Sequence, residues 1–385
     1  MPKRSPRNTT ESLLHAAGGA PEDVGRLIDE LSLEKVAPAV LDELLARVAP
    51  PAEVTVDLLL ELHRAGESVA HTLSFTGGRL SARPGREGEP GARIRYEAAD
   101  LVTALYGPAA RRGGITRQVE SLLRLPGRGA REDTYELFLA QRAYAEAIHS
   151  VIAAVSATPP DLSELSVRFG SDKWGFLHWF TEHYAAHFRH LVDEPIRLLE
   201  IGIGGYDDPE AGGGSLRVWQ RYFRRGLVVG LDLYEKTVRG PRIQTVRGDQ
   251  GDRAVLADLA ERVGPFDVVI DDGSHVNSHV LTSFEALFPH VRDGGLYVIE
   301  DFHTTYWPGF GGAVPGPDAA GTVMGRLKEL LDGLHHPEFE DPATYRPSST
   351  DLAISAIHFY RNLVFIEKGL NTEGAPPSWM PREPV

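Results

Sequence analysis

The sequence predicts an α/β fold, in which a doubly wound and largely parallel sheet with an antiparallel edge hairpin follows a smaller α+β domain. Short apolar runs rich in β-branched residues alternate with helical segments in the second half of the chain, as in a parallel sheet covered on both faces. Two further apolar runs flank a tight turn near the C-terminus and predict the hairpin. The first half changes from helical to strand-like periodicity and back.

The length and composition set limits on the class of protein. At about 150 residues per domain, 385 residues suggest two domains, which we place at 1–155 and 156–385. A net charge of −14 argues against a nucleic-acid partner, because binding to phosphates needs a cationic surface. The chain has no cysteine, which excludes disulfides, thiolate metal sites and cysteine nucleophiles. Neither a secretory signal nor an apolar run long enough to span a membrane is evident, so we expect a cytoplasmic enzyme without a membrane partner.

The first domain shows helical spacing at 11–48 and 55–64, followed by a strand pattern. The runs 70–75 and 79–83 flank a Thr-Gly-Gly turn and predict a hairpin, with a third strand at 92–96. Helical segments are expected at 98–106, 118–125 and 131–157. We find no catalytic constellation in this domain and interpret it as a scaffold for oligomerisation and substrate fit.

The second domain alternates strands with helices in a regular order. Strands are predicted at 197–203, 227–233, 243–247, 266–271 and 295–300, and helices at 215–224, 252–263, 276–291 and 322–335. The hairpin pairs 354–360 with 363–368. This is the outline of the Rossmann-like sheet of class I methyltransferases.

A glycine-rich loop after the first of these strands is the candidate cofactor site. It begins with Glu200, continues through Gly202 and Gly204 to Tyr206, and reaches the next helix at Ser215. Ligands of open α/β sheets bind at the carboxyl ends of strands, and glycine lets the backbone approach them closely. Asp207 stands where a dinucleotide fingerprint has glycine or alanine and would repel a pyrophosphate. S-adenosylmethionine, a sulfonium cation, is therefore favoured over a nicotinamide cofactor, although a purely structural turn is an alternative.

Further candidates for the cofactor site follow the second and third strands. Asp232 ends the second strand, where an acid can bind both ribose hydroxyls. Asp249 and Gln250 follow the third strand and can hydrogen-bond an adenine edge. The alternative for Asp249 is a helix N-cap, a role that Asp252 fits better.

Acidic residues and a histidine follow the last two parallel strands. The carboxylates are Asp271, Asp272, Glu300 and Asp301, and His275 lies three residues after Asp272. Carboxylates this close need a cation, and oxygen ligands suit Mg²⁺, Mn²⁺ or Ca²⁺. We predict Asp272, Glu300 and Asp301 as the metal ligands, His275 as the general base, and Asp271 turned toward the cofactor. The alternative is a set of loop caps on a solvated edge.

The ordered set of motifs resembles the macrolide sugar O-methyltransferases of the mycinamicin and demethylmacrocin type. The motifs are FGSDKWGFLHWFTEHYAAHF, LLEIGIGGY, GDQGD, VIDDGSHV, GLYVIEDFHTTYW and IHFYRNLVFIEKG, and they cover about residues 160–370. The resemblance implies Mg²⁺-dependent methylation of a deoxysugar hydroxyl on a glycosylated natural product, and a homotetramer. It assigns the metal, base and cofactor roles to the residues named above, and it places the loop 171–174 near the cofactor.

The acceptor is the least defined part of this prediction. The segment 303–312 is rich in aromatic residues and glycine, and we interpret it as an acceptor loop or lid, with an ordinary surface loop as the alternative. A catechol or another phenolic natural product could also present two oxygens to the metal. A non-catalytic partner subunit with a degenerate pocket is a third possibility, which the intact set of acids and histidine disfavours.

Overall fold

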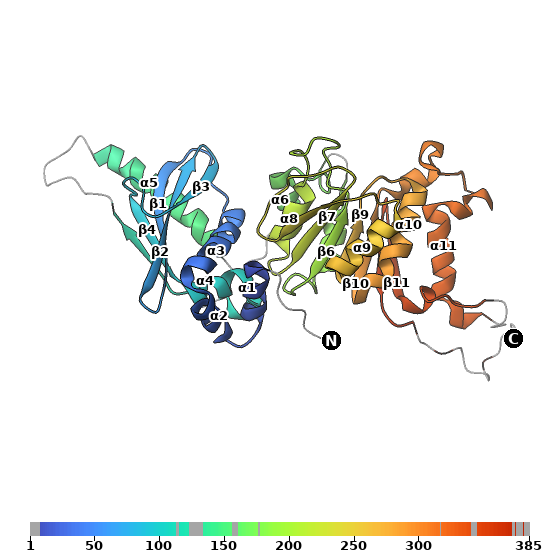
Figure 1. Cartoon of the computed structure of the whole chain (residues 1–385). Coiled ribbons are helices and arrows are strands. Elements are labelled where there is room, and N and C mark those ends of the chain that lie inside the picture. Colours follow the sequence, from blue (N-terminus) through green and yellow to red (C-terminus); the bar gives the residue numbers. More distant parts are fainter. Residues whose placement is uncertain are drawn as a thin grey trace.

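The computed structural model describes residues 8–112, 115–122, 134–155, 161–175, 178–315, 317–339 and 345–371, together with residues 374 and 380. Two sheets, each with its own helices, lie side by side along the molecule (Figure 1). The predicted domain boundary falls at the edge of residues 156–160, which lie outside the described residues. Within the described parts of the chain, no helix combines the length and apolar character needed to cross a bilayer.

The N-terminal domain combines helices with a five-stranded sheet in the order β3-β2-β1-β4-β5. Its strands are β1 (Thr55–Arg64), β2 (Glu67–Thr76), β3 (Arg79–Pro84), β4 (Ala92–Glu97) and β5 (Arg117–Ser121). Its helices are α1 (Thr9–Gly18), α2 (Asp23–Leu31), α3 (Leu33–Arg47), α4 (Ala98–Tyr106) and α5 (Thr134–Ala154).

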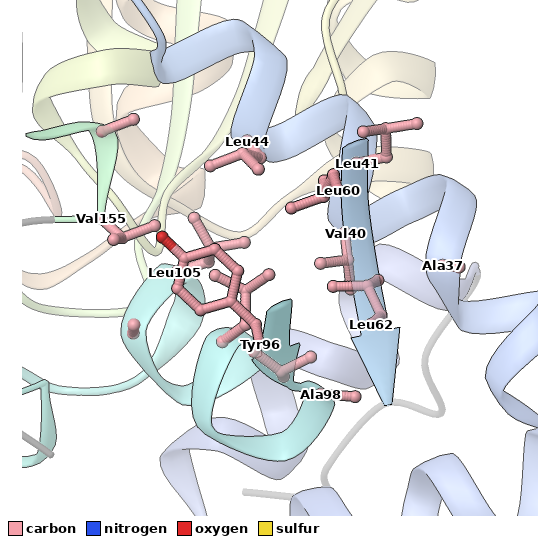
Figure 2. Close-up of a cluster of buried hydrophobic side chains, with 14 of the residues drawn as sticks. Ala37, Val40, Leu41, Leu44, Leu60, Leu62, Tyr96, Ala98, Leu105 and Val155 are labelled. Atoms are coloured by element: carbon pink, nitrogen blue, oxygen red, sulfur yellow. The ribbon is translucent and has the colours of Figure 1, made fainter. Parts of the chain in front are cut away.

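The core of this domain lies between α3 and the middle of the sheet. Figure 2 shows Val40, Leu41 and Leu44 of α3 near Leu60 and Leu62 of β1. All five side chains are buried. Burial of this apolar surface supplies the main driving force that docks the helix on the sheet.

Two predicted helices of this domain are wrong. The segment 55–64 is strand β1, which pairs with β2 on one side and with β4 on the other. As a central strand it is buried on both faces, with Leu58, Leu59 and Leu60 all at most 2% exposed, so it lacks the alternation that marks a strand. The segment 118–125 was expected to be helical, but Arg117–Ser121 forms the edge strand β5, held by its pairing with β4. Residues 123–125 lie outside the described residues. The predicted helical region 11–48 is divided into α1, α2 and α3.

The C-terminal domain contains a seven-stranded sheet in the order β11-β12-β10-β9-β6-β7-β8. Its parallel strands are β6 (Arg197–Ile201), β7 (Leu227–Asp232), β8 (Ile243–Arg247), β9 (Phe266–Asp271) and β10 (Val291–Glu300). The edge hairpin is β11 (Ile354–Tyr360) and β12 (Leu363–Lys368), and β12 runs antiparallel to β10. The helices are α6 (Leu162–Phe169), α7 (Thr181–Phe188), α8 (Gly214–Tyr222), α9 (Arg253–Val263), α10 (Asn277–Leu287) and α11 (Val323–Leu334).

The topology confirms the predicted doubly wound sheet with an antiparallel edge. The chain begins in the middle of the sheet with β6, adds β7 and β8 on one side, and then returns to add β9 and β10 on the other. The strand order therefore reverses between β6 and β9, where open α/β sheets bind their ligands. The predicted helix 276–291 is shorter than expected, because it ends at Leu287 and Val291 already begins β10.

Buried ion pairs and hydrogen bonds join the two domains. Glu43 of α3 accepts hydrogen bonds from Arg47 at 2.6 Å and from Arg242 of the C-terminal domain at 2.8 and 2.9 Å. Arg47 also donates to the carbonyl oxygens of Leu105 and Arg224. These three charged side chains are buried in the junction, so the contact between the domains is an integral part of the fold.

Candidate active site

The predicted site residues converge because their strands are neighbours. Ile201 at the end of β6 pairs with Asp271 at the end of β9, and Asp271 pairs in turn with Ile299 of β10. The loops that follow these strands consequently leave the sheet at one edge. The glycine loop and both acidic segments meet there, as the sequence predicts.

The start of the glycine loop is packed against the end of β9. Gly202 has a φ of +91°, and a Cβ at this position would lie 2.0 Å from the carbonyl oxygen of Asp272. The loop is also fixed to β7, since the Asp232 carboxylate accepts a hydrogen bond from the Ile203 amide at 2.9 Å. Gly204 has a φ of +76° and open space where a Cβ would project, with Gly212 at 4.0 Å as its nearest neighbour. This is a loop that leaves room for a ligand beside its backbone.

Three more of the predicted cofactor residues differ in their surroundings. Glu200 is fully buried and accepts a hydrogen bond from the Ser215 hydroxyl at 2.7 Å, which ties β6 to the start of α8. Burial raises the pKa of the Glu200 carboxyl. Tyr206 has a positive φ and a side chain that is 84% exposed. Its direct contact with a cofactor stays a prediction.

The segment after β8 is organised by Gln250. Its amide nitrogen donates to Asp271 at 2.6 Å, and its carbonyl oxygen accepts from the Ser274 amide at 2.8 Å. Asp249 is exposed and accepts from the Gly251 amide, while Asp252 is the N-cap of α9, the role that the sequence favoured for it. Gln250 thus connects the loops after β8 and β9, and an adenine contact of Asp249 and Gln250 stays a prediction.

Asp271 and Asp272 face different surroundings, as their succession in a strand predicts. Asp271 is buried, with its oxygens accepting hydrogen bonds from Gln250 and Ser283. Burial raises the pKa of Asp271 to about 6. These bonds make Asp271 a support for the loop, and they leave its expected contact with the cofactor untested.

A buried lysine connects three of the carboxylates. The Lys173 ammonium lies 2.6 Å from Glu300, 2.9 Å from Asp272 and 3.2 Å from Glu200, and the lysine itself is fully buried. Burial alone lowers the pKa of Lys173, but the three carboxylates raise it well above its usual value. Glu300 also accepts a hydrogen bond from the Tyr184 hydroxyl. The lysine therefore links the glycine loop to both acidic segments.

A second group of ligand atoms belongs to partly exposed residues. Asp272, His275 and Asp301 each offer one ligand atom, and these atoms lie within 4.8 Å of one another. Within the described residues, Oδ1 of Asp301 is buried and has no hydrogen-bond partner. A buried carboxylate oxygen without a partner is costly unless a cation or donor faces it. The two carboxylates fit an ion that prefers oxygen ligands, such as Mg²⁺ or Mn²⁺, and the imidazole lies close enough to act beside that ion.

The predicted ligands Asp272, Glu300 and Asp301 are divided between these two groups. Asp272 belongs to both, Asp301 lies with His275, and Glu300 lies with Glu200. In the group with Glu200, Oε1 of Glu300 already accepts hydrogen bonds from Lys173 and Tyr184. Metal binding by Glu300 stays a prediction, and it would use the other carboxylate oxygen.

Three further residues of this site have no role assigned from the sequence, although the family resemblance places the loop 171–174, which contains Lys173, near the cofactor. Lys173 and Tyr184 contact Glu300, and His178 lies 3.3 Å from Asp301. The bond to Asp301 raises the pKa of His178. All three precede the first strand of the sheet, so strand-end reasoning does not reach them. Their only signal was the motif FGSDKWGFLHWFTEHY, whose charged and aromatic residues lie close together in the sequence.

The segment after Asp301 is a well-anchored loop. It contains the 3-10 helices η3 (Phe302–Tyr306) and η4 (Pro308–Phe310). Asn277 donates to the carbonyl oxygens of Thr304 and Phe310 and accepts from the Val323 amide. Tyr306 and Trp307 remain 44% and 48% exposed beside the acidic segment. The loop can therefore offer aromatic surface to an acceptor, and its role as a lid stays a prediction.

Comparison with known proteins places this arrangement in a family. The family model described as MycE methyltransferase N-terminal matches residues 10–117. Demethylmacrocin O-methyltransferase of Streptomyces fradiae is 45% identical over 96% of this chain and 94% of its own length. Mycinamicin VI 2''-O-methyltransferase of Micromonospora griseorubida is 42% identical over 97% of this chain and 94% of its own length.

Solved structures of related proteins resemble this chain over nearly its whole length. MycE methyltransferase in complex with Mg and SAH matches with a TM-score of 0.91 and 40% identity, over 99% of this chain and 97% of its own. The complex of MycE with Mg, SAH and mycinamycin VI matches with a TM-score of 0.89 at the same identity, over 99% of this chain and 98% of its own. The likeness spans both domains. The chain belongs to the macrolide sugar O-methyltransferase family and is an S-adenosylmethionine-dependent O-methyltransferase.

Proposed function

We propose that this enzyme transfers the methyl group of S-adenosylmethionine to a sugar hydroxyl of a glycosylated natural product, with a macrolide glycoside as the expected acceptor. The observation that carries this proposal is the group of Asp272, His275 and Asp301 beside the glycine loop. Relatives named for demethylmacrocin and mycinamicin VI support the choice of acceptor. A relative from Streptomyces olivaceus that is 39% identical is named for a rhamnosyl tetracenomycin, so the shared chemistry is the sugar hydroxyl and not the aglycone.

The residues divide the work between binding and proton transfer. Gly202, Gly204 and Asp232 shape the cofactor site, with Glu200 and Ser215 fixing the start of the next helix. Asp272 and Asp301 would hold the divalent ion, with Glu300 as a further ligand. When bound, that ion lowers the pKa of the acceptor hydroxyl. His275 accepts the hydroxyl proton at its imidazole, which contributes roughly 10²–10⁴ in rate when a base is well placed. Alignment of the hydroxyl with the sulfonium methyl contributes much of the rest.

A direct assay tests the proposal. The purified enzyme is incubated with S-adenosylmethionine, Mg²⁺ and a panel of glycosides that includes demethylmacrocin and mycinamicin VI, and products are detected by mass spectrometry. We expect the mass gain of one methylation on at least one glycoside. His275→Ala should lose most of the turnover and retain affinity for S-adenosylhomocysteine in calorimetry. Methylation of simple catechols but of no glycoside would contradict the choice of acceptor.

Removal of the metal tests the role of the acids separately. We expect excess EDTA to abolish turnover, and Mg²⁺ or Mn²⁺ to restore it. Asp272→Asn should show no such restoration, because it removes a carboxylate that both acidic groups share. Full activity in EDTA would contradict the metal role, whichever acceptor is used.

We also propose that the enzyme is a cytoplasmic homotetramer in which the N-terminal domain takes part in assembly. The family relationship supports this, and so does the size of the N-terminal domain, which has its own sheet and core. Light scattering coupled to gel filtration measures the mass in solution. A monomer across the working range of concentration would contradict the assembly.

A further inference from the structure

A cluster of two histidines and a glutamate lies at the edge hairpin of the C-terminal sheet. His187 of α7, His358 of β11 and Glu367 of β12 each offer one ligand atom, and these atoms lie within 4.8 Å of one another. Glu367 pairs with Leu296, four residues before Glu300 on β10, so it lies about 13 Å along the strand direction from that acid. The cluster therefore consists of residues other than those of the candidate active site.

The hairpin places its share of the cluster on one face. His358 is paired with Phe365, and alternate residues of a strand share a face, so this face also carries Tyr360 and Glu367. Helix α7 covers the same face, because the ring of His187 stacks on Phe365 with ring centroids 4.1 Å apart. The positions of all three candidate ligands are thus fixed by regular secondary structure.

The separations of the ligand atoms suit a single metal ion. Nε2 of His358 lies 3.0 Å from Oε1 of Glu367, and Nδ1 of His187 lies 3.9 Å from the same oxygen. Two ligands of one tetrahedral zinc ion lie about 3.3 Å apart, because each is about 2.0–2.1 Å from the metal. The two observed distances lie on either side of this value, so small rotations of the side chains bring the three atoms onto one ion.

His187 is held in the orientation that a metal ligand needs. Its Nε2 lies 3.0 Å from the Tyr360 hydroxyl, which can accept the Nε2 proton and leave a lone pair on Nδ1. Metal-binding histidines commonly use their second nitrogen for an outer hydrogen bond of this kind. Burial and the neighbouring His358 lower the pKa of His187, against the opposing effect of Glu367. The neutral imidazole is the form that binds a metal.

The ionisable neighbours of the cluster leave its carboxylate available to a cation. Lys368 directs its ammonium to the carbonyl oxygens of residues 288–289. His183 and His190, on α7 and just after it, lower the pKa of His187 further through their charge. Glu367 supplies the negative charge of the cluster, and a divalent ion would add the compensating positive charge.

We propose that His187, His358 and Glu367 form a binding site for a divalent transition-metal ion of the zinc class. Two imidazoles and a carboxylate, with water in the fourth position, are a donor set that zinc accepts, whereas Mg²⁺ favours oxygen ligands. Because the three residues come from a helix and two strands, the bound ion fastens α7 to the edge hairpin. The same helix carries Tyr184, which donates to Glu300, so the ion also steadies the support of that acid.

Zn²⁺ is the probe for this site. The full-length enzyme is titrated with Zn²⁺ by calorimetry in excess Mg²⁺. The same titration is made with Asp272→Asn, which removes a carboxylate from the active site, where Zn²⁺ can also bind. We expect one Zn²⁺ per chain to remain in Asp272→Asn and to raise its melting temperature, because an ion that binds only the folded state stabilises it. Crystals soaked in Zn²⁺ should show the anomalous signal of zinc between His187, His358 and Glu367.

Substitutions in the Asp272→Asn background locate the binding. His358→Gln should weaken it by about tenfold or more, because even the loss of an outer partner of a metal ligand costs about 10–100-fold in affinity. Tyr360→Phe keeps the ring and removes that outer partner, so it should weaken binding within this range. The matched control is His149→Gln, at an exposed position of α5, which should leave Zn²⁺ binding unchanged.

Three outcomes would overturn the proposal. One is the absence of saturable binding to Asp272→Asn up to about 1 mM Zn²⁺. Another is equal binding with and without the His358→Gln substitution, and the third is an anomalous signal at the acidic segment alone. None of these results bears on methyl transfer, so the proposed function and the zinc site stand or fall separately.

Discussion

Lys173 is the residue on which the acidic site depends most. Its ammonium contacts Glu200, Asp272 and Glu300, which come from the ends of three different strands. Removing one partner of a buried ion pair costs about 3–5 kcal/mol, because it leaves a charge without compensation. The lysine therefore acts as a positioning residue for the carboxylates and not as a catalytic one.

Substitution of Lys173 by methionine tests this role. We expect Lys173→Met to lose about 3–5 kcal/mol of unfolding free energy and most of the activity, since methionine keeps the volume and removes the charge. Urea denaturation measures the first effect. Lys328→Met, at an exposed position of α11, is the control and should change stability by less than about 0.5 kcal/mol. An equally stable Lys173→Met would show that the three acids do not need the ammonium.

His71 makes the stability depend on pH. Burial lowers its pKa, and among the described residues Nδ1 has no hydrogen-bond partner. A lowered histidine pKa means that the unfolded chain binds a proton more readily than the folded one. The contribution is therefore fully present above about pH 6.5 and is lost as the pH falls from there toward the folded pKa.

The pH dependence can be isolated by substitution. We expect the urea midpoint of the wild type to fall between about pH 7.5 and about pH 5.5, and His71→Gln to show a smaller fall, because glutamine does not titrate in this range. His15→Gln, at an exposed position of α1, is the control and should follow the wild type. Identical pH profiles for all three proteins would remove His71 as the cause.

At the scale of elements, the close approach of the glycine loop to the end of β9 sets the geometry of the cofactor site. Gly202→Ala would place a Cβ 2.0 Å from the Asp272 carbonyl oxygen at a φ of +91°. We expect at least a tenfold loss of affinity for S-adenosylhomocysteine, measured by calorimetry, because the two segments must separate. The control is Gly294→Ala, which has a φ of +79° but open space around the new Cβ. Similar affinities in the two variants would mean that backbone strain and not crowding governs the loop.

The sequence predicted the elements of the C-terminal domain better than those of the N-terminal domain. Parallel strands such as β9 are short apolar runs between helices, and that pattern is visible locally. Strand β1 has consecutive leucines buried on both faces, so its run TVDLLLELHR lacks the alternation of a half-buried strand and predicts a helix. The turn at Ala65 and Gly66, where both residues have positive φ, was the local signal for a hairpin.

The site was predictable to the extent that it depends on strand ends. Asp272 and Asp301 lie close together because they follow the ends of neighbouring parallel strands. The position of His275 beside them is predicted by its spacing of three residues from Asp272. The contacts of Lys173, His178 and Tyr184 depend on how the segment before β6 folds over the sheet edge. Side-chain packing of that kind has no periodicity in the sequence, which is why Glu300 was assigned to the metal without its lysine.

At the scale of the whole molecule, the junction between the domains depends on Glu43. This carboxylate is fully buried and is the shared partner of Arg47 and Arg242. Burial raises the pKa of Glu43, but the two arginines outweigh it and lower the value, so the group is ionised in the folded state. We expect Glu43→Gln to lose about 3–5 kcal/mol of stability, because two buried guanidiniums then lack their counter-charge.

Limited proteolysis and urea denaturation measure the effect of Glu43→Gln. The weakened junction should let the domains separate more often, so proteolytic cleavage of the folded protein is expected to accelerate relative to the wild type. Glu53→Gln, an exposed substitution just before β1, is the control and should leave the cleavage rate unchanged. Unchanged cleavage in Glu43→Gln would show that the apolar contacts alone keep the domains docked.

The single ammonium shared by Glu200, Asp272 and Glu300 has a thermodynamic consequence for how the proposed cofactor and metal ion bind. A ligand that draws Glu200 away from Lys173 changes the charge that Asp272 and Glu300 present. Likewise, a ligand that draws Asp272 or Glu300 away from Lys173 changes the charge that Glu200 presents. By linkage, the factor by which the methyl donor alters affinity for the ion must equal the factor by which the ion alters affinity for the donor. The two ligands are thus expected to load as a coupled pair.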